Sequence, residues 1–314
     1  MGRLLHVYFN ALFGGLGGLL GWMLFGELIS PTWDWWTQAL LGGVLIGALI
    51  GYFVVSVDAI LDRSLVRFAR YAAYGSVLGG AGGALGFWVG DWVNYLLVST
   101  AGAEATLLVQ ITSVLARGFG WMLFGLAVGV SEGIASRSLG KMSYGAIGGS
   151  LGGFIGGAVF AWLMLVLDKE DSSYVWGQAI GLVVLGACIG ALTALVEEVF
   201  KPAAIKVMRG WQEGREYPLV KTASVIGRDE GVDILLLRDM KVEKRHAVIQ
   251  RHGQRFLLMN NNAPATSTLV NGEPVAQSAE LHDGDRIQLG NVVLRFLLRA
   301  ARERPRKPAG PSSR

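Results

Sequence analysis

The sequence predicts a multi-domain chain, in which an α-helical polytopic membrane domain of six spans in three repeated hairpins precedes an all-β sandwich. The first observation is a change of composition, because residues 4–199 are mostly apolar and glycine-rich whereas those after Lys201 are mixed and charged. The second is a series of weakly charged stretches of roughly 20 residues or more, the length that a helix needs to cross a bilayer. The third is a change after Trp211 to short apolar stretches separated by turn residues, which is typical of a sandwich.

Six stretches predict the spans, and each is expected to be helical because only a helix satisfies its own backbone hydrogen bonds in lipid. They lie between Arg3 and Glu27, Asp34 and Asp58, Arg70 and Asp91, Glu104 and Glu132, Lys141 and Asp168, and Asp171 and Glu197.

Basic residues between the spans predict the orientation. One side carries Arg3, Arg63, Arg67, Arg70, Arg137, Lys141, Lys201, Lys206 and Arg209, whereas the other carries only Lys169. Because Lys and Arg concentrate in cytoplasmic loops, both termini are expected in the cytoplasm of a multi-pass protein of the plasma (inner) membrane. The lipid bilayer is therefore one expected partner.

An internal repeat organises the spans. The hexapeptide Gly-Trp-Met-Leu-Phe-Gly occurs at residues 21–26 and 120–125. A glycine also precedes a carboxylate by seven positions three times, in the pairs Gly51 and Asp58, Gly125 and Glu132, and Gly190 and Glu197. These similarities predict three tandem hairpins of about 65 to 75 residues each.

Glycines make up 45 of the 314 residues, about twice the usual share. Many are spaced four apart, as in Gly43, Gly47, Gly51 and in Gly145, Gly149, Gly153, Gly157. Residues four apart share a helix face, and a face without side chains lets two backbones pack closely in lipid. We favour tight packing, within one chain or in a homo-oligomer, over a flexible pore or a transporter interface.

Charged residues within the spans are candidate functional sites. Arg117 lies well inside the fourth span by sequence, and a charge there is costly unless it pairs or meets water. It is either a pathway or anion contact, or the start of a span that follows an interfacial helix over residues 92–115.

Asp58, Glu132 and Glu197 stand at equivalent ends of the even spans. As a ring they could hold cations with the help of a counter-ion, because like carboxylates repel each other. We favour the simpler interpretation that each pairs with its neighbouring basic residue, namely Arg63, Arg137 or Lys201.

No catalytic constellation stands out in the sequence. The single cysteine, Cys188, excludes an intrachain disulfide and a cysteine-based metal cluster. Neither a nucleophile elbow, a His/Glu metal helix nor a phosphate loop is present. The expected protein is not an enzyme, holds no cofactor or metal, and does not bind nucleic acid.

The C-terminal part predicts strands at residues 221–226, 234–237, 247–250, 255–259, 268–270, 286–289 and 292–297. Its motifs, in order, are Val225-Ile226-Gly227-Arg228, Asp233-Ile234, Val242-Glu243-Lys244-Arg245-His246-Ala247, Val270-Asn271-Gly272 and Leu281-x-Asp283-Gly284-Asp285-x-Ile287-x-Leu289-Gly290. Over residues 218–300 this order resembles a forkhead-associated (FHA) domain.

The resemblance implies a phosphothreonine-binding loop surface and assigns residues to it. Arg228 matches the arginine that contacts phosphate, Lys244 supplies a further donor, and Glu243 stands where the family has serine. The partner-binding residues that it implies are Arg228, Lys244, Glu243, Arg245, Thr266, Ser267 and Asn271, with Gly227 and His246 as structural residues. A carboxylate at position 243 repels phosphate, so a partner without phosphate, or packing on the chain's own membrane domain, stays open.

These observations predict a membrane domain over residues 1–205, a linker over 206–217, an FHA-like cytosolic domain over 218–300 and a disordered basic tail over 301–314. The favoured function is a membrane-anchored signalling or assembly scaffold whose FHA-like domain binds a cytosolic protein, with a phosphothreonine peptide as the candidate ligand. The alternative is a channel or transporter that the FHA-like domain regulates.

Overall fold

A computed structural model describes residues 3–101, 107–167, 172–236, 238–261 and 263–299. The basic tail expected over 301–314, Lys169 and Asn262 lie outside these residues. The chain divides into two compact units, residues 1–200 and 201–314, which we call the helical unit and the β unit.

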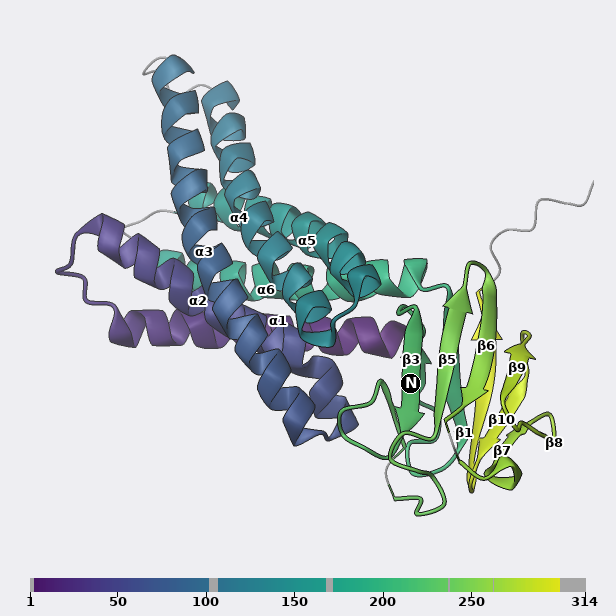
Figure 1. Cartoon of the computed structure of the whole chain (residues 1–314). Helices are drawn as coiled ribbons and strands as arrows, with labels where there is room; N and C mark the ends of the chain where they lie inside the picture. The colour runs from purple at the N-terminus through teal and green to yellow at the C-terminus, as the bar shows by residue number, and fades with distance from the viewer. Residues whose placement is uncertain (1–2, 102–106, 168–171, 237, 262, 300–314) are drawn as a thin grey trace, which may run out of the picture. The chain divides into compact units, whose positions relative to one another are not determined.

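Six helices form the helical unit (Figure 1). They are α1 (Arg3–Leu28), α2 (Trp35–Asp62), α3 (Leu65–Ala101), α4 (Leu107–Ser136), α5 (Leu139–Val166) and α6 (Ser172–Phe200). Within the described ranges, five of them are long and apolar enough to cross a membrane, and α3 is not among the five. The six-helix expectation is therefore confirmed, whereas six membrane crossings stay a prediction.

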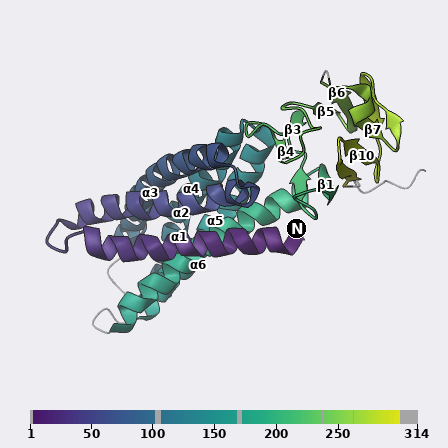
Figure 2. The ribbon, with the colours of Figure 1, turned by 90° about the horizontal axis from the view of Figure 1, so that it is seen from below.

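The helices form a closed ring, in which each packs on the next and α6 packs on α1. Figures 1 and 2 show α1 running beside α2 and α6. The three even helices also contact one another. The even helices therefore meet at the centre of the ring, as expected for three hairpins that repeat around an axis.

The repeat is visible in the turns that join the hairpins. Arg63 and Arg137 adopt left-handed backbone conformations, with φ of 54° and 53°, and each is followed by a serine. The Ser64 hydroxyl accepts the amide of Arg67 at 3.3 Å, and the Ser138 hydroxyl accepts that of Lys141 at 3.2 Å. Each serine thus caps the first turn of the next helix.

Layers of apolar side chains fill the centre of the ring. Ile50, Phe124 and Ile189 are fully buried in one hydrophobic cluster, and each precedes its repeat's carboxylate by eight residues. Val54 and Val128 form the next layer, one helical turn nearer to the carboxylates. Apolar side chains thus fill the centre of the ring.

Glycines let neighbouring hairpins approach closely. A Cβ atom on Gly47 of α2 would overlap the carbonyl oxygen of Gly79 on α3. The same relation joins Gly129 of α4 to Gly145 of α5, and Gly14 of α1 to Gly186 of α6. The glycine faces therefore pack within one chain, because each backbone fills the space that a side chain would need.

The β unit is a sandwich of two sheets (Figure 1). Its strands are β1 (Ala203–Arg209), β2 (Glu216–Pro218), β3 (Ala223–Gly227), β4 (Ile234–Leu235), β5 (Ala247–His252), β6 (Arg255–Asn260), β7 (Thr268–Val270), β8 (Glu273–Pro274), β9 (Ser278–Leu281), β10 (Arg286–Leu289) and β11 (Val292–Leu298), with a 3₁₀ turn η1 (Ala265–Ser267). One sheet has the order β2-β1-β11-β10-β7-β8 and the other β4-β3-β5-β6-β9. The rings of Phe256 and Phe296, 5.2 Å apart, join them in a common core.

The β unit begins earlier than the sequence predicts. β1 pairs with β11 along its length, and β2 pairs with β1, so residues 206–217 are part of the sandwich and not a linker. Ile205 and Val207 are fully buried in its core, and Lys206 between them is half-buried. The alternation of buried and half-buried residues in β1 is short, and it follows an apolar span directly. Composition alone therefore did not separate β1 from α6.

Candidate functional site

Two loops of the β unit lie side by side where β3 ends. The amide of Arg228 donates to the carbonyl of Glu243 at 3.1 Å, and that of Asp229 donates to the carbonyl of Lys244 at 3.2 Å. Gly227 permits this approach, because a Cβ there would overlap the Lys244 carbonyl oxygen. The backbone thus brings Arg228, Glu243 and Lys244, which the sequence predicted as one site, to the same place.

His246 braces the loop from beneath. It is fully buried, and burial lowers the pKa of its imidazole, which keeps the ring neutral. Its Nδ1 accepts the amide of Glu243 at 3.0 Å. A neutral ring with Nδ1 as acceptor carries its proton on Nε2, which lies 3.0 Å from the Thr268 hydroxyl. The predicted structural role of His246 therefore has a specific geometry, which fixes the backbone of residue 243.

Asn261 links a third loop to the site. Its side-chain amide donates to the carbonyl of Arg245 at 2.8 Å, and its backbone amide donates to the carbonyl of His246 at 3.0 Å. The resemblance did not assign this residue, although the run of three asparagines from Asn260 was a visible signal. Asn260 has a separate role, since its amide bonds the carbonyls of Ala263 and Val275.

The Arg228 side chain has a hydrogen-bond donor, Nε, without an acceptor among the described residues. This Nε is buried, while Nη1 lies 3.9 Å from the sulfur of Met240. Glu243, Lys244 and Arg245 beside it are exposed. A buried guanidinium donor without an acceptor is costly, and an anionic oxygen would satisfy it. The local charge is mixed, because Arg228, Lys244 and Arg245 are cationic whereas Asp229 and Glu243 are acidic.

The remaining predicted residues of the loop surface have local roles. The Ser267 hydroxyl donates to the carbonyl of Pro264 at 2.7 Å, and Thr266 precedes it in η1. Asn271, with φ of 53°, donates to Asp285 and accepts the amide of Arg286, both at 2.9 Å. The side chains of Ser267 and Asn271 therefore stabilise turns in this structure, and their contact with a partner stays a prediction.

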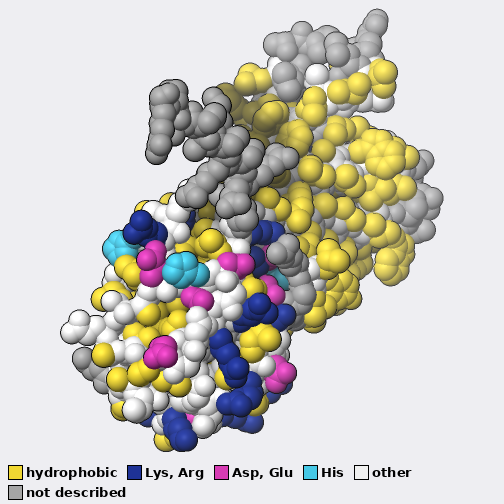
Figure 3. All heavy atoms as spheres, turned by 90° about the vertical axis from the view of Figure 1, so that its right-hand side faces the viewer, with side chains coloured by type: hydrophobic (Ala, Val, Ile, Leu, Met, Phe, Trp, Pro, Cys, Tyr) yellow, Lys and Arg dark blue, Asp and Glu magenta, His cyan; other side chains and the backbone are white. Residues whose placement is uncertain are grey.

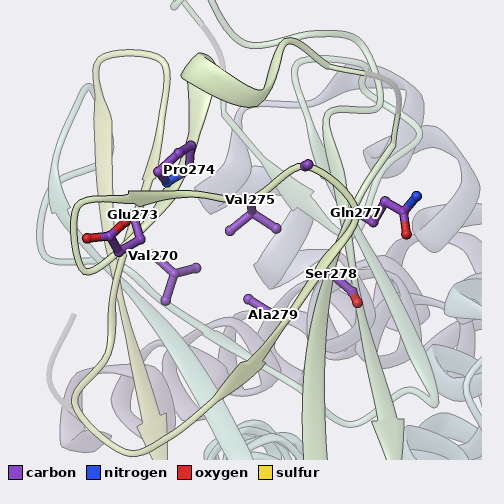
Figure 4. Close-up of a pocket in the computed structure, with 8 residues that line it drawn as sticks. Val270, Glu273, Pro274, Val275, Gln277, Ser278 and Ala279 are labelled. Atoms are coloured by element: carbon purple, nitrogen blue, oxygen red, sulfur yellow. The ribbon is translucent and has the colours of Figure 1, made fainter.

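A shallow hollow of about 450 Å³ lies elsewhere on the β unit, between β7, β8 and β9. Figure 4 shows Val270, Val275 and Ala279 pointing into it, whereas Glu273 and Gln277 point away. None of the predicted site residues lines this hollow. Val270 and Val275 belong to the hydrophobic core, and Ala279 packs against it.

In the helical unit, the three predicted carboxylates share a cation that the sequence analysis did not assign to them. The ammonium of Lys141, on α5, lies 3.3 Å from Asp58, 2.5 Å from Glu132 and 3.4 Å from Glu197. The favoured expectation gave each carboxylate its own neighbouring basic residue and did not include this shared cation; pairing with Arg63, Arg137 and Lys201 stays a prediction. The repeat marks Arg67 as the equivalent residue, since Lys141 and Arg67 each stand three residues after a capping serine, but Arg67 pairs with Asp62 instead.

Arg117 lies within α4, which is continuous from Leu107 to Ser136, so no helix break occurs at Arg117. Trp92 belongs to α3, which ends at Ala101, so a single helix over residues 92–115 is not observed, whereas the position of Arg117 in the bilayer stays a prediction. The Arg117 guanidinium lies 3.9 Å from the carboxylate of Asp91 on α3, and its side chain is 45% exposed. A carboxylate of the neighbouring helix thus offsets its charge.

Comparisons with known proteins converge on the β unit. A family described as the cytoplasmic domain of an inner membrane component of T3SS matches residues 206–300. A solved domain from a structural and functional analysis of phosphothreonine-dependent FHA interactions is 32% identical, over 32% of this chain and 98% of that chain, with a TM-score of 0.29. The FhaA FHA domain, solved in complex with the intracellular domain of Rv3910, is 34% identical over 30% and 98% of the two chains, with a TM-score of 0.27.

The cytoplasmic domain of the T3SS sorting platform protein PscD from P. aeruginosa is 21% identical, over 36% of this chain and 98% of that one, with a TM-score of 0.29. No curated protein matches the chain. The β unit is a binding module by class. More specifically, an identity of 32% over almost the whole of a solved FHA domain shows that this chain belongs to the FHA family through its β unit.

Proposed function

We propose that this protein is a membrane-anchored assembly scaffold, whose FHA unit recruits a phosphothreonine-containing protein in the cytoplasm. The observation that carries the proposal is the buried, unpaired Nε of Arg228 at the junction of the predicted recognition loops. Guanidinium makes forked, charge-assisted hydrogen bonds to phosphate, and Lys244 lies next to it as a second cation.

The membrane part of the proposal is supported by five helices with the length and composition of membrane spans. The matched family, an inner membrane component with a cytoplasmic domain, supports an inner-membrane location and a cytoplasmic FHA unit. With six crossings, the positive-inside rule puts both termini there.

The rival function, a channel or transporter, has less support from the helical unit. Ile50, Phe124 and Ile189 fill the centre of the ring, where a pathway along the repeat axis would have to pass. A tightly packed ring is instead suited to anchoring and presenting the FHA unit.

Glu243 gives the proposed site a specific property. It replaces the hydroxyl that the family offers to phosphate, and His246 fixes its backbone within the site. Because carboxylate and phosphate repel each other, we propose that binding is weak unless the partner also contacts the surrounding cations.

Binding of phosphothreonine and unphosphorylated peptide libraries to residues 201–300 tests the proposal. This segment has its own hydrophobic core and forms a separate compact unit. We expect selection of phosphothreonine peptides and at least a tenfold loss of affinity in Arg228→Ala, about 1.4 kcal/mol. The matched control is Arg286→Ala, which removes an exposed arginine of the other sheet.

Equal binding by the wild type and Arg228→Ala would remove Arg228 from ligand contact. Equal binding of phosphorylated and unphosphorylated peptides would leave the scaffold role but overturn phosphate recognition.

A further inference from the structure

A row of cations crosses the outer face of the sheet that contains β1, β11 and β10. In this sheet Lys206 lies directly opposite Arg295, and Arg295 lies directly opposite Arg286. Residues that pair in register share a face of the sheet, and the neighbours Ile205 and Ile287 belong to the core on the other face. The three cations therefore lie on the outer face, on adjacent strands about 5 Å apart.

This arrangement is unfavourable in water. Like charges directly opposite each other on neighbouring strands destabilise a sheet, and here two such pairs share Arg295. Among the described residues, Arg286 and Arg295 have no ion-pair partner. Glu216 of β2 lies opposite Lys206, but its carboxylate is 3.8 Å from the ammonium of Lys201. An anionic partner would turn the repulsion within the row into attraction.

The row borders a hollow of about 430 Å³ on the same face. The residues that line it are Met208, Arg209, Gly284, Arg286, Val293 and Arg295. Arg209 is held in place, because its Nε and Nη2 both donate to the carbonyl of Asn291 at 3.3 Å. The Met208 side chain beside it is 41% exposed. Three guanidinium groups thus surround an exposed apolar side chain, a combination suited to the interface of a membrane with anionic lipid.

The two acidic residues that flank Gly284 in the sequence have other roles. Asp283 accepts the backbone amide of Leu298 at 2.8 Å, and Asp285 accepts that of His282 at 2.7 Å. Within the described ranges, neither carboxylate forms an ion pair with an arginine of the hollow. The cations of this face therefore stay available to an external anion.

Covalent continuity keeps this face near a membrane surface. α6, which has the length and composition of a membrane span, ends at Phe200, and β1 begins at Ala203. Lys206 follows Phe200 by six residues, which span about 20 Å at most when extended. This bound follows from the chain length alone, and it keeps the row within reach of the lipid headgroups at the end of α6.

We propose that this outer face binds the anionic phospholipid headgroups of the membrane that anchors the chain, through Lys206, Arg209, Arg286 and Arg295. An acidic protein would meet the same charges, but the short connection to α6 presents lipid at a high effective concentration. Each cation near an anionic membrane surface contributes about fivefold in affinity. The proposal rests on α6 crossing the membrane, and it is independent of what the loops around Arg228 bind.

Cosedimentation of residues 201–300 with lipid vesicles tests the face. We expect binding to vesicles of phosphatidylcholine with phosphatidylglycerol, no binding to phosphatidylcholine alone, and loss of binding in about 1 M salt, where the screening length is about 3 Å. Arg295→Glu reverses the central charge of the row and should weaken binding about tenfold or more. The control Arg255→Glu makes the same charge change at an exposed position of β6, in the other sheet, and should bind like the wild type.

Urea unfolding of the same variants checks the physical argument. Arg295→Glu replaces two like-charge pairs with opposite-charge pairs, so we expect its midpoint to rise above that of the wild type. A lower midpoint would contradict a repulsive row. Arg295→Gln is a second variant that only removes the charge, and it should weaken vesicle binding about fivefold.

The full chain in nanodiscs tests the face while it is connected to α6. An environment-sensitive fluorophore is attached at Met208→Cys, or at the control Met259→Cys on β6, after Cys188→Ser removes the single native thiol. Both methionines are partly exposed, at 41% and 37%. We expect a blue shift of the emission at position 208 only, and only in nanodiscs that contain phosphatidylglycerol. Equal spectra at the two positions, or in the two lipids, would overturn the proposal.

Three results of the vesicle experiment would also overturn it. They are equal binding of the wild type to both kinds of vesicle, equal binding of the wild type and Arg295→Glu to anionic vesicles, and binding to polyglutamate but not to anionic vesicles. The last result would assign the face to an acidic protein. Peptide selection through Arg228 is measured without lipid, so either proposal can fail while the other stands.

Discussion

The helical unit and the FHA unit place their polar groups in opposite positions. In the helical unit, apolar side chains such as Leu65, Trp88 and Leu139 are exposed, whereas Lys141 and Glu132 are largely buried. In the FHA unit, an apolar cluster forms the core, and Arg228 and Lys244 lie in loops. Figure 3 shows this contrast, since the described helical surface is mostly yellow and the β surface mixes blue, magenta and white.

The difference follows from the solvent of each unit. Lipid makes an exposed charge costly, so charges in the helical unit pair with one another inside the ring. Water makes an exposed apolar surface costly, so the FHA unit buries it and leaves its charges for a ligand. Charged groups therefore pair with one another inside the helical unit, whereas those at the surface of the FHA unit are available to bind a ligand.

The largest effect is expected from Lys141→Met in the helical unit. This change leaves three carboxylates without their common cation, and breaking a buried ion pair from one side costs about 3–5 kcal/mol. Thermal unfolding of the full chain in detergent measures it. Adding Glu132→Gln to Lys141→Met should recover part of the lost stability. A Lys141→Met variant as stable as the wild type would show that the ion pairs of Lys141 do not stabilise the helical unit.

Glycine packing gives the next largest effect. Gly47→Ala places a Cβ against the Gly79 carbonyl, and overpacking of this kind costs about 1–3 kcal/mol. Gly26→Ala is the matched control, because a Cβ there meets nothing within 4 Å. Similar melting temperatures for the two variants would contradict close backbone packing between α2 and α3.

In the FHA unit, His246 predicts a dependence on pH. Burial lowers the pKa of its imidazole, so the folded unit binds a proton less readily than the unfolded chain. Its stabilising contribution is therefore complete above the unfolded pKa of about 6.5 and is lost as pH falls below that value. Urea unfolding of residues 201–300 across this range measures the loss.

His246→Gln should remove this part of the dependence, whereas His252→Gln, at an exposed position, should leave it intact. A profile that both variants leave unchanged would assign the acid sensitivity to other groups.

The smallest effect is expected at Glu243. Glu243→Ser restores a hydroxyl and removes a negative charge, which at about 4 Å in water is worth about 1 kcal/mol, or roughly a fivefold gain in affinity for a phosphothreonine peptide. Titration of labelled peptide measures it, with Glu273→Ser on β8 as the control. A loss of affinity would mean that Glu243 contacts the partner favourably.

The sequence by itself determined the two domains, the helices and most of the strands. Hydropathy and length identify helices because lipid permits few alternatives, and the ordered motifs around Arg228 and His246 identify the FHA family. The strands β1, β2, β8 and β9 were not predicted, because β1 follows an apolar span directly and the other three have only two to four residues. β4 and β7 are as short, but they adjoin motifs of the FHA family.

The tertiary structure alone decided which residues meet. Lys141 follows Asp58 by 83 residues, and nothing in its local sequence predicts that it serves all three carboxylates. Packing of α1 on α2 brings His6 to Asp58, and the junction of three loops leaves the Arg228 Nε unpaired. Local sequence sets the solvent and conformation of each segment, whereas charge pairing depends on distances that only the packed chain defines.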